Sequence, residues 1–194
     1  MSDDRREVAS ADETAALIER MAAAVWAGRR PGSPFYLVGV RTRGAALAER
    51  LGQELSHIGG DTIAVGAVDI TLYRDDLGEG RRWPVLRGTE IPFAVDEAEI
   101  ILVDDVLFTG RTIRAAMNAI CDLGRPGRIR LAVLVDRGHR ELPIEPEVVG
   151  LKLATGRHDR VRVRLRPLDP ADEIVHVGAD PAHGPTSPER RPSP

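Results

Sequence analysis

The chain has 194 residues, of which 42% are hydrophobic and 29% are charged, a balance typical of one soluble globular domain rather than a disordered or fibrous chain. Its net charge of -3 excludes a general attraction to nucleic acid or to an anionic membrane. The charged N-terminus MSDDRREVAS lacks the apolar run of a signal peptide, and no stretch is apolar enough to span a membrane, so we expect a cytoplasmic protein.

Two residue types restrict the chemistry. Lys152 is the only lysine, so phosphate contacts must come from arginine side chains or backbone N–H groups. Cys121 is the only cysteine, which excludes an internal disulfide and any cysteine-cluster metal site. Because Cys121 falls within a helical apolar pattern, we expect it to pack in the core.

The first half of the chain alternates helical and strand patterns. Apolar spacing and breakers predict, in order, a helix over 12–27, a strand over 35–40, a tight turn over 41–44, a helix over 45–55 and a strand over 62–72. The charged segment that follows, 73–87, has little periodicity and is typical of a mobile arm.

The second half repeats the alternation. It predicts a strand over 99–104, a loop over 105–110, a helix over 111–123, and strands over 130–135, 148–153, 161–165 and 173–177. Residues 1–11 and 178–194 lack apolar anchors, so we expect a disordered N-terminus and a disordered tail around one domain over 12–177. Alternating strands and helices predict an α/β fold, with a mainly parallel sheet flanked by helices.

The run IILVDDVLFTGRT, residues 100–112, is the leading site candidate. In an open α/β sheet, ligands bind beyond the carboxyl ends of the strands, where Asp104, Asp105 and the following loop fall. Thr109-Gly110-Arg111-Thr112 opens a helix whose unpaired N–H groups favour a phosphate. The two acids suit ribose hydroxyls or a magnesium site. A capped helix start in a flavodoxin-like or dinucleotide-binding protein is the alternative, but G-x-G-x-x-G and G-x-x-x-x-G-K-[ST] are both absent.

This run resembles the signature by which type I phosphoribosyltransferases bind phosphoribosyl pyrophosphate (PRPP). VGVRTRG at 38–44, VDITLYRDDL at 68–77 and LAVLVDRGHRELPI at 131–144 are similar to the bifunctional pyrimidine operon regulator and uracil phosphoribosyltransferase family, PyrR. The resemblance covers residues 12–177 and implies a type I phosphoribosyltransferase-like fold with a flexible hood arm. The PRPP-binding residues that it implies are Ile100, Ile101, Leu102, Val103, Asp104, Asp105, Val106, Leu107, Phe108, Thr109, Gly110, Arg111 and Thr112.

Other segments acquire roles from the same resemblance. The turn after the strand 35–40 is similar to the pyrophosphate loop of the family, with Thr42 and Arg43 as binding residues. The arm 73–87 resembles the hood that closes over the site, with Arg74 and Arg87 reaching the pyrophosphate. A surface turn between strand and helix is the alternative for residues 41–44.

The segment Val135-Asp136-Arg137-Gly138-His139-Arg140 resembles the base-binding segment of the family. Backbone amides match the edge of a pyrimidine ring, and Val135 and Arg137 are the residues that we assign to the base. His139 is more typical of a structural or surface histidine than of a catalytic one.

The implied reaction joins uracil to PRPP, giving uridine monophosphate (UMP) and pyrophosphate. Asp104 and Asp105 are the predicted catalytic residues, and they contact Mg2+ indirectly, through substrate or water. The family forms homodimers or homotetramers. A phosphoribosyltransferase for another base, without RNA binding, is the alternative, because it would change only the pocket near residues 135–140.

The resemblance also implies UMP- or UTP-responsive control of pyrimidine genes through binding to operon messenger RNA, by attenuation or at translation. The candidate RNA-binding residues are Arg20, Arg157 and Arg160, with Arg162, Arg164 and His158 beside them. A solvent-exposed strand face is the alternative for this group. Where RNA-binding members carry Thr-Arg and then a histidine, this chain reads Glu19-Arg20 and then Ala23, and Glu145 replaces an arginine. These changes predict weaker phosphate binding.

Overall fold

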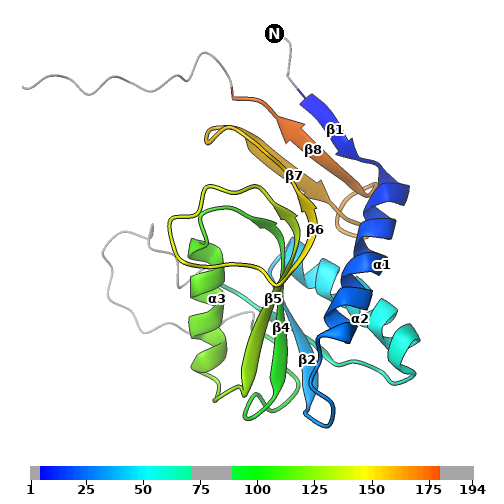
Figure 1. The fold of residues 1–194 in the computed structure, drawn as a ribbon, viewed down its shortest axis with the longest axis vertical. Helices are drawn as coiled ribbons and strands as arrows, with labels where there is room; N and C mark the ends of the chain where they lie inside the picture. The colour runs from blue at the N-terminus through cyan, green and yellow to red at the C-terminus, as the bar shows by residue number, and fades with distance from the viewer. Residues whose placement is uncertain (1–4, 71–88, 180–194) are drawn as a thin grey trace, which may run out of the picture.

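A computed structural model describes residues 5–70 and 89–179 of the chain (Figure 1). The helices are α1 (Ala11–Ala27), α2 (Arg43–Gly59) and α3 (Arg111–Cys121). The strands are β1 (Arg5–Ala9), β2 (Phe35–Val40), β3 (Val65–Val68), β4 (Glu99–Leu107), β5 (Arg128–Asp136), β6 (Val148–Lys152), β7 (Arg160–Arg164) and β8 (Glu173–Val177). No helix in these two ranges is long and apolar enough to cross a membrane.

Five strands form the central sheet, in the order β3-β2-β4-β5-β6, and every neighbouring pair is parallel. Leu102 of β4 lies opposite Val38 of β2 on one side and Leu131 of β5 on the other. The side chains of Ile100, Ile101, Leu102 and Val103 are all buried because both faces of this sheet are covered. The predicted α/β fold with a mainly parallel sheet is confirmed.

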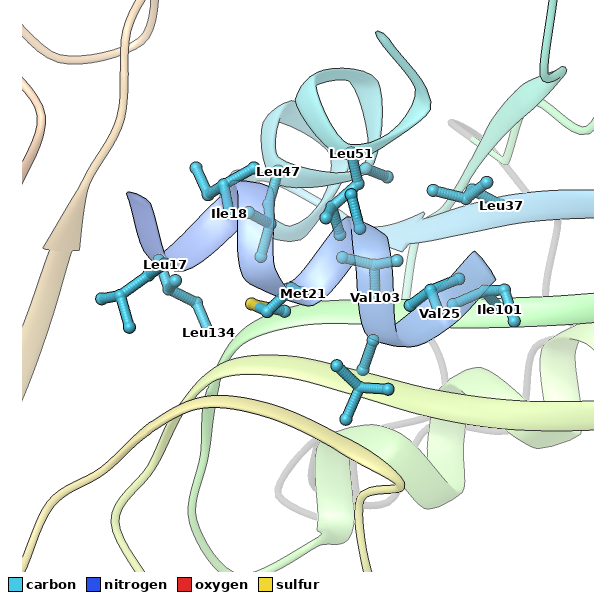
Figure 2. Close-up of a cluster of buried hydrophobic side chains, with 14 of the residues drawn as sticks. Leu17, Ile18, Met21, Val25, Leu37, Leu47, Leu51, Ile101, Val103 and Leu134 are labelled. Atoms are coloured by element: carbon cyan, nitrogen blue, oxygen red, sulfur yellow. The ribbon is translucent and has the colours of Figure 1, made fainter. Parts of the chain in front are cut away.

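The helices form layers on the two faces, with α1 and α2 on one side and α3 on the other (Figure 1). Successive residues of β4 alternate between the two cores: Ile101 and Val103 pack under α1 and α2, and Ile100 and Leu102 pack under α3. Figure 2 shows the first core, where side chains of both helices meet those of the strands. Full burial of a leucine or isoleucine stabilises the fold by about 2 kcal/mol.

A second, antiparallel sheet has the order β1-β8-β7. The expected disordered N-terminus over 1–11 is therefore wrong for residues 5–11: residues 5–9 pair with β8, and residues 11 onward belong to α1, after the capping box formed by Ser10 and Glu13. Partners more than 160 residues away in sequence hold β1 in place, and local patterning does not show them. Residues 1–4 and 180–194, with most of the predicted tail, lie outside the described residues.

Element boundaries also differ from the expectations. The strand predicted over 99–104 continues to Leu107, so Asp105 lies within β4 rather than in a loop. The helix predicted over 45–55 begins at Arg43 and ends at Gly59. Cys121 is exposed at the end of α3, so its expected core packing is wrong: the apolar face of that helix passes through Ile120 instead.

A buried ion cluster closes the amino-terminal edge of the central sheet. The Arg130 guanidinium on β5 and the Glu99 carboxylate that begins β4 are 4% and 1% exposed, with Nη1 and Oε1 3.2 Å apart. Arg130 also donates to the carbonyl of Val25 and pairs with Glu147, while the N–H of Arg30 donates to Glu99 at 2.7 Å. These bonds fasten the end of α1 to two sheet strands, in a place where an unpaired charge is costly.

We expect Glu99→Ala to lower the free energy of unfolding by about 3 kcal/mol, because it leaves the buried guanidinium of Arg130 without its most buried partner. Glu147→Ala is the matched control: its side chain is 43% exposed, and the loss should stay below about 1 kcal/mol. Urea unfolding near neutral pH measures both. Equal losses would contradict a dominant role for the Glu99 pair.

Candidate functional site

Three loops meet at the carboxyl edge of the central sheet. They follow β2, β4 and β5, and backbone bonds join the last two: the N–H of Arg137 donates to the carbonyl of Leu107, and the N–H of Glu141 donates to the carbonyl of Thr109. Gly44 brings the first loop against β4, since a Cβ there would lie 2.7 Å from the carbonyl oxygen of Val103. The structure thus brings together the segments that the sequence nominated separately.

Asp104 and Asp105 occupy the carboxyl half of β4. Asp104 is 5% exposed, Asp105 is half-buried, and the Asp105 N–H donates to Asp104 Oδ1 at 3.0 Å. Burial, with the neighbouring charge of Asp105, raises the pKa of Asp104 well above its ordinary value, and burial also raises the pKa of Asp105. Both carboxyls therefore keep a proton to a higher pH than a solvent-exposed aspartate does.

The turn before α3 presents backbone N–H groups at the start of a helix. Gly110 has a left-handed φ of 92°, and a Cβ there would lie 3.3 Å from Ile144, so this position requires glycine. No side-chain cap occupies the helix start at Gly110, and Thr109 Oγ1 accepts the N–H of Arg111 at 3.4 Å. Arg111 and Thr112 are exposed. This is the geometry of an anion site at a helix N-terminus.

The apolar part of the predicted PRPP-binding run does not face the site. Ile100, Ile101, Leu102, Val103 and Leu107 are at most 1% exposed and form the two cores, so, contrary to the expectation, their side chains pack inside the protein and do not contact PRPP. Val106 and Phe108 are half-buried. The run thus has two parts: its apolar half packs in the two cores, and its polar half lies at the carboxyl edge of the sheet.

The loop after β2 contains a cis peptide bond between Arg41 and Thr42. Thr42 is exposed, and Arg41 pairs with Glu90 at 2.8 Å. Arg43 donates from Nε and Nη2 to the two carboxylate oxygens of Asp169, at 3.2 and 3.0 Å. That hydrogen bonding holds the pKa of the Asp169 carboxyl below its usual value and raises the pKa of Arg43.

Within the segment 135–140, Arg137 makes several side-chain contacts. Its guanidinium lies 4.2 Å from the ring centroid of Phe108 and donates to Thr155 Oγ1 at 3.2 Å and to the Gly156 carbonyl at 2.8 Å. Burial lowers the pKa of Arg137. Val135, by contrast, is fully buried within β5, so its side chain belongs to the core and its assignment to the base is corrected.

Sequence reasoning missed three residues of this site. Asp169 follows β7 and pairs with Arg43 from the other end of the chain. Arg140 donates to the Phe108 carbonyl at 2.8 Å and pairs with Asp136. These contacts connect the segment 135–140 to the turn before α3. Thr155 Oγ1 accepts a hydrogen bond from Arg137, and the carbonyl oxygen of Thr155 lies 2.7 Å from Nε2 of His139. The second contact agrees with a structural role for His139. Of these three residues, only Arg140 lies in a segment that the sequence nominated, 135–140.

The remaining nominated residues are dispersed. Arg20 is exposed on α1 and bonds to Ala16 of its own helix, and Arg160 is exposed on β7. Arg157 pairs with Glu141, which also binds Arg111, so Arg157 lies close to the turn before α3. Arg74, Arg87 and the arm 73–87 lie outside the described residues. Within 5–70 and 89–179, no cluster of three or more metal-ligating side chains is found.

We expect Asp104→Asn to stabilise the ligand-free protein by about 1 kcal/mol at neutral pH, because it removes a carboxyl that the fold holds against its charged form. The folded pKa lies above the ordinary 3.8, so the wild-type protein loses stability as pH rises through the raised pKa. The advantage of the variant should therefore grow with pH. Urea unfolding from about pH 5 to about pH 8 measures it.

Asp61→Asn, at an exposed position between α2 and β3, is the control and should show no such pH-dependent difference. A constant or shrinking difference for Asp104→Asn would contradict the raised pKa.

The fold has solved counterparts. Hypoxanthine phosphoribosyltransferase of Trypanosoma cruzi matches with a TM-score of 0.68 at 16% identity, over 93% of this chain and 97% of that chain. Hypoxanthine phosphoribosyltransferase of Staphylococcus aureus matches with a TM-score of 0.65 at 17% identity, over 91% and 93%. At these identities the likeness establishes the fold alone, and it confirms the expected type I phosphoribosyltransferase-like architecture.

Sequence comparison is more specific. Residues 5–164 match the phosphoribosyl transferase domain family. The chain is 47% identical over 174 residues to the bifunctional protein PyrR of Deinococcus radiodurans, covering 90% of this chain and 95% of that protein. It is 54% identical over 139 residues to PyrR of Pelotomaculum thermopropionicum, covering 72% and 77%. The chain therefore belongs to the PyrR family of phosphoribosyl transferase domain proteins.

Proposed function

We propose that the protein is a uracil phosphoribosyltransferase, which forms UMP and pyrophosphate from uracil and PRPP. One observation carries the proposal: the acidic end of β4, the amino end of α3 and the loop of Thr42 and Arg43 lie at one edge of the sheet. PRPP has a ribose, a 5-phosphate and a diphosphate, and this edge offers a separate polar group for each.

Each part of the substrate meets a different element. The N–H groups and hydroxyls of Thr109 to Thr112 bind the 5-phosphate, and Asp104 and Asp105 accept hydrogen bonds from the ribose hydroxyls. Thr42 and Arg43 bind the diphosphate that leaves from the anomeric carbon. The uracil nitrogen attacks that carbon as the bond to the diphosphate oxygen breaks, and the protein acts by positioning and by neutralising charge.

The carboxyl pair suits an indirect magnesium site. Asp104 and Asp105 would hold Mg2+ through substrate hydroxyls or water, because the part of the chain that the structure describes supplies no third acidic ligand beside them. When bound, Mg2+ would neutralise negative charge on the diphosphate. Burial raises the pKa of both carboxyls, and a bound cation would favour their charged forms.

The base is read by the segment after β5. Arg137 stacks on Phe108 and is held by Thr155 and Gly156, so it forms a fixed wall beside the phosphate turn. Backbone amides of this segment match the edge of uracil. A phosphoribosyltransferase for a purine base, without an RNA-binding role, is the second candidate, since it would keep every other contact.

The decisive measurement is UMP formation from uracil and PRPP with Mg2+. We expect turnover with uracil and none with adenine or hypoxanthine. Asp105→Asn should lower kcat/KM by about a hundredfold through lost ribose and magnesium contacts, while Asp61→Asn leaves it unchanged. A wild-type protein that makes no UMP and binds no PRPP would overturn the proposal, and turnover with hypoxanthine would favour the purine enzyme.

We also propose a regulatory function, in which the protein, as a homodimer or homotetramer in the cytoplasm, binds pyrimidine-operon messenger RNA in response to UMP or UTP. The bifunctional designation of its relatives and the exposed Arg20 and Arg160 favour it. The net charge of -3 and the carboxylate of Glu145 oppose it, because specific RNA binding needs a local cationic surface.

Titration of the protein against its own operon leader at near-physiological salt tests regulation. We expect UMP to tighten binding, and the leader to bind about a thousandfold more tightly than a scrambled RNA of equal length. Arg20→Gln should weaken leader binding and leave uracil turnover intact. Micromolar affinity that depends neither on UMP nor on the RNA sequence would contradict the regulatory function.

A further inference from the structure

The turn between β6 and β7, residues 155–159, holds the guanidinium of Arg137. Arg137 Nε donates to Thr155 Oγ1 at 3.2 Å. Its Nη2 donates to the carbonyl oxygens of Gly156 and Arg157, at 2.8 and 3.4 Å. The turn thus occupies two of the three guanidinium nitrogens, and the third, Nη1, has no hydrogen-bond partner among the residues that the structure describes.

Arg137 depends on this turn because its charge is buried without a carboxylate partner. The residue is 7% exposed, and it forms no ion pair within the part of the chain that the structure describes. Burial lowers the pKa of Arg137, and the nearby negative charge of Asp159 opposes that effect. Neutral oxygens of the turn therefore hold the guanidinium, so its position is only as well defined as the turn itself.

Asp159 closes the turn through its side chain and its backbone. Its Oδ2 accepts the N–H of Gly156 at 2.6 Å, and its own N–H donates to the Gly156 carbonyl at 3.2 Å. That carbonyl is the one that accepts Arg137. Oδ1 of Asp159 also accepts the N–H of Ala179, just beyond the end of β8. The shape of the turn therefore depends on this one carboxylate.

His176 of β8 orients the carboxylate. Its Nε2 lies 2.8 Å from Asp159 Oδ2, and because a charged carboxylate only accepts hydrogen bonds, this nitrogen carries the hydrogen. The hydrogen bond from His176 is the main cause of the lowered pKa of Asp159, so it favours the charged form that the turn requires. The β7–β8 ladder sets His176 opposite Val161, two residues after Asp159, and so fixes where the imidazole meets the carboxylate.

We propose that Asp159 and His176 are positioning residues of the base site, which hold the turn 155–159 so that Nη1 of Arg137 meets a carbonyl oxygen of the base. The inference rests on the proposed function, in which Arg137 and Phe108 form a wall beside the base. His176 holds Asp159, and Asp159 holds both backbone polar groups of Gly156. The antiparallel sheet thus acts on the base site through three successive hydrogen-bonded contacts.

This arrangement affects the base more than the rest of the substrate. Uracil presents two carbonyl oxygens, which accept hydrogen bonds from a guanidinium. PRPP and ribose 5-phosphate carry no base, and their proposed contacts lie on β4, α3 and the loop after β2. A general loss of stability would instead lower the active fraction, and with it kcat, at an unchanged KM for uracil.

The test compares His176→Leu, which removes the donor, with His176→Gln, whose side-chain amide still donates to Asp159. Steady-state assays of the whole protein give kcat and KM for uracil and for PRPP. We expect His176→Leu to raise KM for uracil about tenfold and to leave KM for PRPP unchanged, and His176→Gln to recover most of the loss. His57→Leu, at an exposed histidine of α2, is the control and should change neither KM.

A double variant tests whether the two residues act in series. Asp159→Ala should raise KM for uracil as His176→Leu does, and the combination should cost little more than either change alone, because both remove the same support. Fully multiplied effects would contradict a single chain of contacts.

Calorimetric titration with UMP, inosine monophosphate and ribose 5-phosphate needs no turnover. Weaker UMP binding by His176→Leu, beside unchanged ribose 5-phosphate binding, supports the positioning role. Equal KM for uracil in His176→Leu and His57→Leu would overturn it, and so would an equal loss of ribose 5-phosphate affinity. A wild-type protein without uracil turnover, whose His176→Leu variant binds inosine monophosphate less tightly, would sink the proposed uracil reaction and leave the positioning role standing.

Discussion

The register of β4 between β2 and β5 is the constraint on which the site depends. Gly39 of β2 lies opposite Val103, and Asp104 lies opposite Val133 of β5, so the acid pair begins where β2 ends, while β4 and β5 continue together to Leu107 and Asp136. A slip of one residue would exchange the residues of the two cores and the faces on which Asp104 and Asp105 lie. The apolar half of IILVDDVLFTGRT therefore acts on the site indirectly, because it fixes the position along the sheet and the face of each carboxylate.

The acid pair of Asp104 and Asp105 lowers the stability of the folded protein, which the register of β4 otherwise favours. Burial and the neighbouring carboxyl raise the pKa of Asp104, so the fold disfavours the charged form of this side chain. The fold tolerates that strain because strong interactions lie elsewhere, in the two apolar cores and in the Glu99–Arg130 pair at the opposite edge of the sheet. Stability is concentrated at one edge and ligand chemistry at the other, as is common for sites that bind charged substrates.

Local patterns predicted what local physics decides. Period-two and helical apolar spacing located the strands of the central sheet and the three helices of the described residues. The same patterns gave no information on pairing at long range. The strand β1, with the charged sequence RREVA, is ordered by β8, and Asp169 reaches Arg43 across 126 residues. Val135 was assigned to the base because a segment resemblance does not separate side chains that face the ligand from those that face the core.

The antiparallel sheet acquires a role from these long-range contacts. Asp169 binds Arg43 at the start of α2, and Asp172 binds Arg50 of the same helix at 2.6 Å, so the turn between β7 and β8 contacts α2 at two points nearly two turns apart. Two such contacts fix a helix in rotation as well as in position. Since the loop of Thr42 and Arg43 leads directly into α2, fixing this helix also fixes the loop. The small sheet therefore supports the loop of Thr42 and Arg43, just as the register of β4 supports Asp104 and Asp105.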